Sequence, residues 1–270
     1  MKIKILGSGG AIPTPRPLCC CKVCQQARVE GVPYKRNSCS IYIEDIKTLI
    51  DCPEDIGDSL NREGIVDVAN LLITHWHPDH VFGLRILLEA NYDFIRCKAI
   101  RVTNLYIPSK VYKMIKQKYP TIDYLIDTMK LANLHLVEDG EVIDFGDVSV
   151  RVVGYAGKNS ETYAYLFKSQ AKSALFILCD SIGFEREVEF KNLDLLVHEC
   201  GIFSYEIIKH EISFPDMIKR FKHMLPSKVV LLHIEEIELK THGLGKLKQL
   251  EKKNRSLNLT FAYDGLMIKL

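Results

Sequence analysis

The chain has 270 residues, and 47% of them are hydrophobic, which is enough to bury a substantial core. Its formal net charge of +2 gives no strong attraction to nucleic acid or to a membrane surface. No apolar run is long enough for a membrane span, and the charged start is too short for a secretory signal. Nine cysteines without such a signal favour reduced thiols and metal ligands over disulfides, so we expect a cytoplasmic protein.

The hydrophobic pattern alternates between the period of strands and that of helices. We expect strands over residues 2–7, 40–51 (two strands around a turn), 71–74, 99–107, 134–153 (several short strands), 163–168, 174–179, 193–197, 229–233, 259–262 and 266–270. Helices are expected over residues 81–91, 109–118, 214–224 and 244–253. Ser109 is expected to cap its helix. The last two strands are expected to pair as a hairpin around Asp264 and Gly265.

The chain has no internal repeat and no linker rich in Pro, Gly or Ser. A single domain over residues 1–270 is therefore the simplest interpretation, with an insertion at about residues 13–38 that its cysteines hold in place. Because strands and helices alternate, we expect helices to cover the outer faces of the sheets.

Residues 75–80 are the most informative segment, because they contain three histidines and one aspartate. An apolar strand is expected before them and a helix after them, which places them at the carboxyl end of a strand. His75 and His77 can reach one ion, while Asp79 and His80 suit a second. A metal pair is a known device for hydrolysing phosphate esters and amides. A His-rich surface loop is the alternative, but four donors in so short a segment argue against it.

The pattern His-x-His-x-Asp-His, continued by Gly83, resembles the signature of the metallo-β-lactamase superfamily over essentially the whole chain. The resemblance implies an α/β fold, a four-layer αββα sandwich of two mixed sheets flanked by helices. It also implies one ion held by His75, His77 and Asp180, and a second held by Asp79, His80, Asp180 and His233. A hydroxide between the two ions would be the nucleophile, oriented by Asp79.

Lys158 stands where the superfamily places a further histidine ligand. A charged lysine repels a dication, so we expect the ion at His75 and His77 to be bound more weakly than the ion at Asp79 and His80. A neutral Lys158 could ligate only if its pKa were strongly lowered. The expected content is therefore one or two zinc or manganese ions at the active site.

A second cluster, Cys-x-Cys-x-x-Cys, is formed by Cys19, Cys21 and Cys24. This spacing suits a structural zinc that takes its fourth ligand from elsewhere in the chain. Within the superfamily the insertion resembles that of the cyclic phosphodiesterase of phosphonate breakdown. That resemblance places Glu236 at the fourth position, and His242 is the alternative. Cys20 is a spare thiol, and the remaining cysteines are assigned to the core: Cys39, Cys52, Cys97, Cys179 and Cys200.

Three further residues are candidates for the chemistry. By the same resemblance, His210 is the proton donor to the leaving oxygen, with a surface helix cap as the alternative. His198 is interpreted as a residue that orients a metal ligand. Arg36 is a candidate phosphate contact.

The predicted function is that of a metal-dependent phosphodiesterase acting on small nucleotide or sugar phosphates, cyclic ones included. A catalytically degenerate metal-binding protein, suggested by Lys158, and a hydrolase of other esters or thioesters are the alternatives. The expected partner is a small phosphoester substrate, and homodimerisation is left open. Nucleic acid and membranes are not expected, because the charge is balanced and no Gly-rich arm like that of ribonuclease Z is present.

Overall fold

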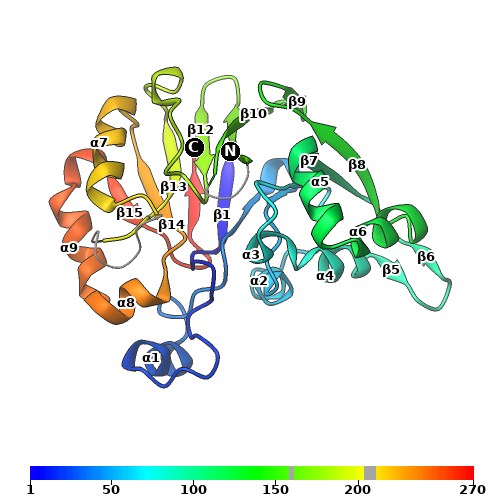
Figure 1. Cartoon of the computed structure of the whole chain (residues 1–270), viewed down its shortest axis with the longest axis horizontal. Coiled ribbons are helices and arrows are strands. Elements are labelled where there is room, and N and C mark those ends of the chain that lie inside the picture. Colours follow the sequence, from blue (N-terminus) through cyan, green and yellow to red (C-terminus); the bar gives the residue numbers. More distant parts are fainter. Residues whose placement is uncertain (158–160, 204–210) are drawn as a thin grey trace.

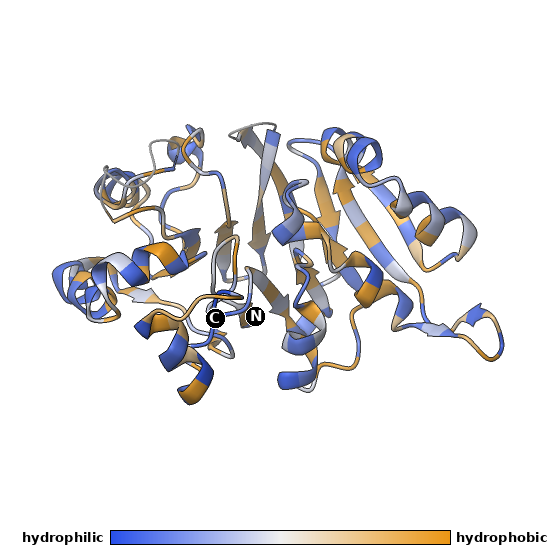
Figure 2. Ribbon diagram, turned by 60° about the horizontal axis from the view of Figure 1, so that its bottom comes forward, coloured by the Kyte–Doolittle hydropathy of each residue, from blue (hydrophilic) through white to orange (hydrophobic). Residues whose placement is uncertain are grey.

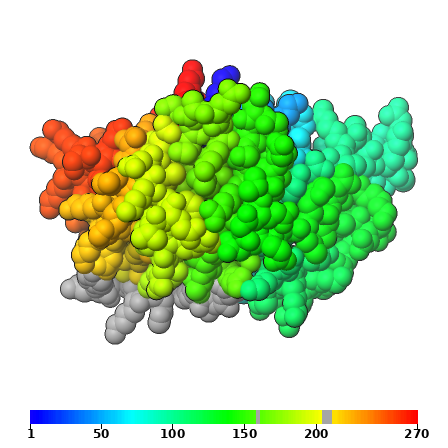
Figure 3. All heavy atoms as spheres, turned by 90° about the horizontal axis from the view of Figure 1, so that it is seen from above, coloured from blue at the N-terminus to red at the C-terminus, as the bar shows by residue number. Residues whose placement is uncertain are grey.

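The computed structural model describes residues 1–157, 161–203 and 211–270. Two large mixed sheets face each other, and helices flank them on the outside (Figure 1). This arrangement confirms the predicted α/β sandwich. Figure 3 shows the two ends of the chain side by side at the surface, where the Met1 amino group donates to the Leu270 carbonyl at 3.0 Å. Within the described residues, no helix combines the length and the hydropathy needed to cross a bilayer.

The first sheet has seven strands in the order β16-β1-β2-β3-β4-β7-β8. Their bounds are Met267–Lys269, Lys2–Gly7, Ser40–Ile43, Thr48–Ile50, Asn70–Leu72, Thr103–Pro108 and Ala132–Val137. Pairing is antiparallel from β16 to β3 and parallel from β3 to β8. A small separate ladder joins β5 and β6, Tyr92–Asp93 and Lys98–Ala99.

The second sheet also has seven strands, in the order β15-β14-β13-β12-β11-β10-β9. Their bounds are Leu259–Phe261, Val229–Leu232, Leu195–Glu199, Ser173–Ile177, Glu161–Lys168, Ser149–Ala156 and Val142–Asp144. Strands β9 to β12 pair antiparallel, and β12 to β15 pair parallel. Strands β11 and β12, which follow each other in the chain, pair as a hairpin.

The helices are α1 Lys22–Glu30, α2 Ile56–Arg62, α3 Pro78–Val81, α4 Leu84–Glu89, α5 Ser109–Lys118, α6 Thr121–Asp123, α7 Phe214–Met224, α8 Glu236–His242 and α9 Gly245–Lys253. Short 3-10 turns occupy η1 Glu44–Ile46, η3 Glu187–Glu189 and η4 Arg255–Leu257, and η2 Tyr124–Thr128 is a π-helical turn. Helices α1, α2 and α8 were not expected from the sequence. The N-cap of α5 is Pro108 rather than Ser109, so the predicted cap is wrong.

The apolar residues divide into two clusters. One joins the facing surfaces of both sheets, for example Ile3 and Ile41 with Tyr165 and Phe176. The other packs the outer face of the second sheet against α7, through residues such as Phe221. Figure 2 shows the same division, with hydrophobic strands in the middle layers and hydrophilic outer faces on the helices. This burial fixes the strand ends that carry the site.

The helix predicted over residues 81–91 is interrupted at Gly83. A side chain there would place a Cβ 2.0 Å from the Pro53 carbonyl oxygen. The Gly83 amide donates to the Cys52 carbonyl at 2.8 Å. This close approach ends α3 and begins α4, and it holds the residues after the His-rich motif against those after β3.

The predicted terminal hairpin is wrong, because β15 and β16 belong to different sheets. A turn does form at Asp264 and Gly265, but it carries the chain from the second sheet to the first. Phe261 is buried in the helix-covered cluster, whereas Ile268 is buried between the sheets. The two strands beside this turn are buried in different apolar clusters, and this burial, rather than the turn sequence, decides which strands pair.

Asp264 ties this crossing to the beginning of the chain. One of its carboxylate oxygens accepts hydrogen bonds from the Ser8 amide and hydroxyl at 2.9 and 2.8 Å. The other accepts from the Asn37 amide at 2.8 Å, and Arg62 Nη1 lies 3.4 Å from it. Asp264 is 2% exposed, so water cannot take the place of these hydrogen-bonding partners.

We therefore expect Asp264→Ala to lower the free energy of unfolding by about 3 kcal/mol, because it leaves buried donors and a cation without their acceptor. Urea unfolding followed by circular dichroism measures the change. Asp147→Ala, at an exposed turn, is the matched control and should change stability by less than about 0.5 kcal/mol. Equal stability of both variants would contradict the role given to Asp264.

Candidate metal centre

The candidate site lies where the carboxyl ends of strands from both sheets meet. Residues 75–80 follow β4, Asp51 follows β3, Asp180 follows β12 and His233 follows β14. Asp51, Asp180 and His233 have positive φ values of 60°, 50° and 57°. This left-handed conformation is costly for residues with a side chain and is held only where the surroundings require it. The chain turns sharply at each of these positions, which brings their side chains together.

The first donor group consists of His75, His77 and Asp180. One donor atom of each lies within 4.8 Å of those of the other two. His75 Nε2 lies 2.9 Å from His77 Nδ1, which in turn lies 3.8 Å from Asp180 Oδ2. The thiol of Cys179 approaches His75 and His80 within the same limit, and this cysteine is buried, as expected from the sequence.

The second donor group consists of Asp79, His80 and His233. The Nε2 atoms of His80 and His233 lie 3.2 and 3.6 Å from the same Asp79 oxygen, Oδ2. Both nitrogens are buried and neither has a hydrogen bond. Buried polar atoms normally have a partner. Two such imidazole nitrogens beside one carboxylate match the donor set of a divalent ion such as zinc or manganese.

Asp51 orients residues of both groups. Its carboxylate accepts hydrogen bonds from the Thr74 amide at 2.8 Å and the Thr74 hydroxyl at 2.7 Å. It also lies 2.7 Å from His80 Nδ1, which leaves Nε2 of that ring for an ion. The Thr74 hydroxyl lies 2.9 Å from His75 Nδ1 and fixes the second ring in the same way. Such outer partners set the tautomer and direction of metal-binding imidazoles.

The electrostatics of the site combine burial with close opposite charges. Burial opposes the charged form of His80, but the Asp79 and Asp51 carboxylates outweigh it and raise the pKa of His80 well above its usual range. For His233, burial is likewise outweighed, mainly by Asp79 and Glu235, and the pKa rises to about 9. In His75 burial dominates and lowers the pKa well below its usual range. Binding of a cation here would displace protons from His80 and His233.

The loop after Asp180 is held by Arg220 of α7. The Arg220 guanidinium donates to the carbonyl oxygens of Ser181 and Phe184, both at 2.8 Å. The Ser181 amide donates to the Glu199 carboxylate at the end of β13. The amide and the carbonyl group of Ser181, the residue after Asp180, are therefore both held by buried charged side chains.

His198 does not contact a candidate ligand. Its Nδ1 lies 2.7 Å from the Glu199 carbonyl oxygen, and its Nε2 lies 3.4 Å from Arg220 Nη1. Burial, with Arg220 nearby, lowers the pKa of His198 to about 3, so the ring is neutral. Its direct contacts are with Arg220 and the backbone, rather than with a metal-binding side chain as the sequence suggested.

The cysteine cluster joins the insertion to α8. The thiols of Cys19, Cys21 and Cys24 lie 3.8, 3.6 and 3.4 Å from Glu236 Oε1. The four donor atoms all lie within 4.8 Å of one another. Glu236, at the start of α8, is therefore the residue placed in the fourth position. Figure 1 shows α1 standing apart from the sheets, with α8 the nearest labelled helix.

The alternative fourth ligand, His242, faces another partner. Its Nε2 lies 3.7 Å from Glu238 Oε2, on the same helix. The cysteines assigned to the core are buried, with the exception of Cys97. Cys97 is exposed on the β5–β6 hairpin, so its assignment to the core was wrong. Cys20 is exposed, in keeping with a spare thiol.

Two expected site residues, Lys158 and His210, lie outside the described residues. The expectation for Arg36 is wrong. Arg36 is 4% exposed, and its guanidinium donates to Ser8 Oγ at 2.7 Å and to the Ala262 carbonyl at 2.5 Å. These hydrogen bonds hold the crossing between the sheets against the residues after β1.

Several solved structures share this architecture. A diphosphatase of the PhnP family superposes with a TM-score of 0.75 at 22% identity, covering 100% of this chain and 97% of that chain. Zn²⁺-bound PqqB from Methylobacterium extorquens superposes with a TM-score of 0.77 at 16% identity, covering 100% of both chains. The metallo-β-lactamase fold protein YhfI from Bacillus subtilis superposes as well, with a TM-score of 0.70 at 14% identity, so the chain has the metallo-β-lactamase fold that the sequence predicted.

The family follows from the sequence itself. Residues 29–255 match the family described as Anti-Pycsar protein Apyc1, and the chain belongs to this family. Among curated relatives, the ribonuclease Z of Picrophilus torridus is 30% identical over 192 residues, which is 68% of this chain and 53% of that protein. The chain thus spans about half the length of this relative.

We expect Asp51→Asn to weaken metal binding at the His-rich motif by about 10- to 100-fold, because the amide cannot serve all three donors that the carboxylate accepts from. Titration with zinc followed by calorimetry gives the affinity. Asp45→Asn, in the partly exposed turn after β2, is the control. Unchanged affinity in Asp51→Asn would contradict the orienting role.

Cys24→Ser should remove one zinc ion per chain and lower the melting temperature, because the insertion loses its connection to α8. Metal analysis by mass spectrometry and a thermal scan measure both. Cys20→Ser, at the exposed neighbouring thiol, should leave both values unchanged. Equal metal content in the two variants would show that the cluster holds no ion.

Proposed function

We propose that this protein is a metal-dependent hydrolase that cleaves phosphodiester bonds in small nucleotide or sugar phosphates, cyclic ones included. The observation that carries the proposal is the pair of adjoining donor groups. Asp79, His80 and His233 form one group, and His75, His77 and Asp180 form the other. Two buried imidazole nitrogens without hydrogen bonds face the same carboxylate, which is the arrangement expected of a site built for a cation.

The donor chemistry supports zinc or manganese at the His-rich motif and zinc at the cysteine cluster. Imidazole suits zinc, and carboxylates extend the range toward harder ions such as manganese. Three thiolates with one carboxylate form a closed set, which suits a structural zinc and leaves no open position for a substrate. One or two ions at the active site are proposed. The first site is proposed to be the weaker one, because the sequence has Lys158 where the superfamily has a further histidine ligand.

When bound, the active-site metal polarises the phosphoryl group and lowers the pKa of a water so that it can attack. The protein's own residues supply position and proton transfer. Asp79 Oδ2, between the Nε2 atoms of His80 and His233, is placed to orient the attacking water. His210 is the proposed proton donor to the leaving oxygen.

The names of the similar proteins support a phosphoester substrate. A diphosphatase and a ribonuclease Z both act on phosphorus esters or anhydrides by their names. The formal net charge of +2 is small for a protein that binds a long nucleic acid, and this favours a small substrate.

Hydrolysis of bis-p-nitrophenyl phosphate and of a 2′,3′-cyclic nucleotide, with zinc or manganese added, tests the proposal. The wild-type protein should turn over at least one of them. His75→Ala and His80→Ala should each lower kcat/KM by at least about a hundredfold, because the ion supplies several kcal/mol of transition-state stabilisation. His223→Ala, on the exposed side of α7, should have no effect.

The alternatives give different results in the same experiment. Metal binding without turnover of any ester would favour a catalytically degenerate metal-binding protein. Turnover of a thioester, or of a precursor transfer RNA, in preference to the small phosphodiesters would contradict the proposed substrate class.

A further inference from the structure

A cavity of about 300 Å³ lies beside the His-rich motif, between α3–α4 and α5–α6. Its lining is mainly apolar and includes Val81, Phe82, Ile115, Tyr119, Ile122 and Leu125. Its volume is at the lower end of the range for small-molecule sites, roughly 300–1,000 Å³, so it suits a group no larger than a ring system.

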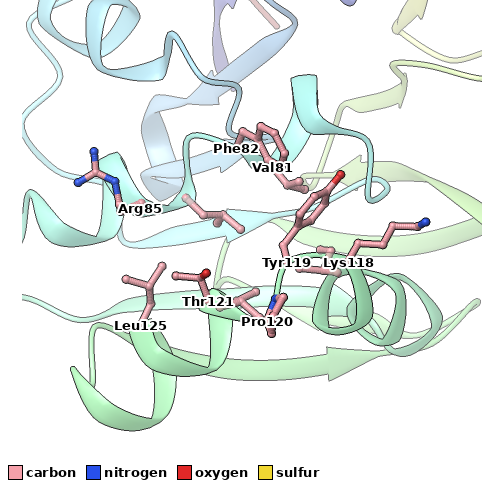
Figure 4. Close-up of a pocket in the computed structure, with 11 residues that line it drawn as sticks. Val81, Phe82, Arg85, Lys118, Tyr119, Pro120, Thr121 and Leu125 are labelled. Atoms are coloured by element: carbon pink, nitrogen blue, oxygen red, sulfur yellow. The ribbon is translucent and has the colours of Figure 1, made fainter.

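Two aromatic rings form part of the cavity wall. Phe82 and Tyr119 meet edge to face with their ring centroids 4.6 Å apart. Phe82 is 45% exposed, which is a large exposure for a phenylalanine beside a candidate active site. In Figure 4, Tyr119 extends from the end of α5 toward Val81 and Phe82, with Lys118 on its other side.

The same wall adjoins the metal ligands. Phe82 follows His80 by two residues and is the C-cap of α3. Burial raises the pKa of the Tyr119 phenol, and the Asp79 carboxylate is the next contributor, so the two groups are within electrostatic reach. Phe82, through its position in the chain, and Tyr119, through its interaction with Asp79, therefore lie near the second donor group.

Trp76 and Lys118 extend this wall on the side of the first donor group. The Trp76 and His77 rings lie edge to face at 4.8 Å. The Lys118 ammonium lies 4.4 Å from the Trp76 ring centroid, a cation–π distance. Its positive charge at the edge of the wall favours an anionic ligand.

We propose that the cavity beside Phe82 and Tyr119 binds the heterocyclic base of the substrate while its phosphate lies at the metal ligands. This subsite rests on the proposed phosphodiesterase function and determines specificity within it. Aromatic faces bind bases by stacking with little dependence on base identity, so the subsite should accept several bases. A base-free cyclic phosphate would use only the metal ligands.

Binding by calorimetry tests the subsite without requiring turnover. The probes are cytidine 3′-monophosphate and glycerol 3-phosphate, added to zinc-loaded protein. Tyr119→Leu and Phe82→Leu should each raise the Kd for the nucleotide about tenfold and leave the Kd for glycerol 3-phosphate unchanged. Tyr119→Phe, which keeps the ring, should retain nucleotide binding. Tyr124→Leu, at a tyrosine that is 52% exposed and outside the cavity lining, is the control.

Kinetics separate this inference from the proposed function. With a 2′,3′-cyclic nucleotide, Tyr119→Leu should raise KM about tenfold with little change in kcat, whereas glycerol 1,2-cyclic phosphate should give unchanged constants. An equal effect on both substrates, or no effect in either ring variant, would overturn the subsite. Ring-dependent nucleotide binding without any turnover would support the subsite and refute the phosphodiesterase function.

Discussion

The buried carboxylate of Asp51 is the interaction on which the rest of the site depends. It joins the end of β3 to Thr74 beyond the end of β4, and to His80 in α3. Through the Thr74 hydroxyl it also fixes His75. One fully buried anion thus orients a histidine in each donor group. Its left-handed backbone, with φ of 60°, is maintained by these same hydrogen bonds.

Long-range connections then hold the two halves of the site at a fixed separation. Asp264 links the crossing between the sheets to the residues just after β1 and just before β2, and Arg220 fixes the loop after Asp180. The cysteine cluster attaches the insertion to α8, which begins three residues after His233. A site assembled from distant segments requires such ties, because each donor group combines residues about 100 or more positions apart.

The sequence predicted much of this arrangement, and its failures have physical causes. The His-rich motif in residues 75–80 resembles that of the metallo-β-lactamase superfamily, and this resemblance predicted the fold and the members of both donor groups. Asp51 was overlooked because an aspartate after an apolar strand is as typical of a turn as of a site. The terminal hairpin and the role of Arg36 depended on which sheet each strand joins, and that is decided by burial rather than by local pattern.

The central claim is that the strand ends of the two sheets bind a catalytic metal. An anomalous-difference map from a crystal grown with zinc, measured on both sides of the zinc absorption edge, tests it most directly. The account predicts a strong peak among Asp79, His80 and His233, an equal or weaker one among His75, His77 and Asp180, and a separate peak at the cysteine cluster. A map with density at the cysteines and none at either histidine group would contradict it.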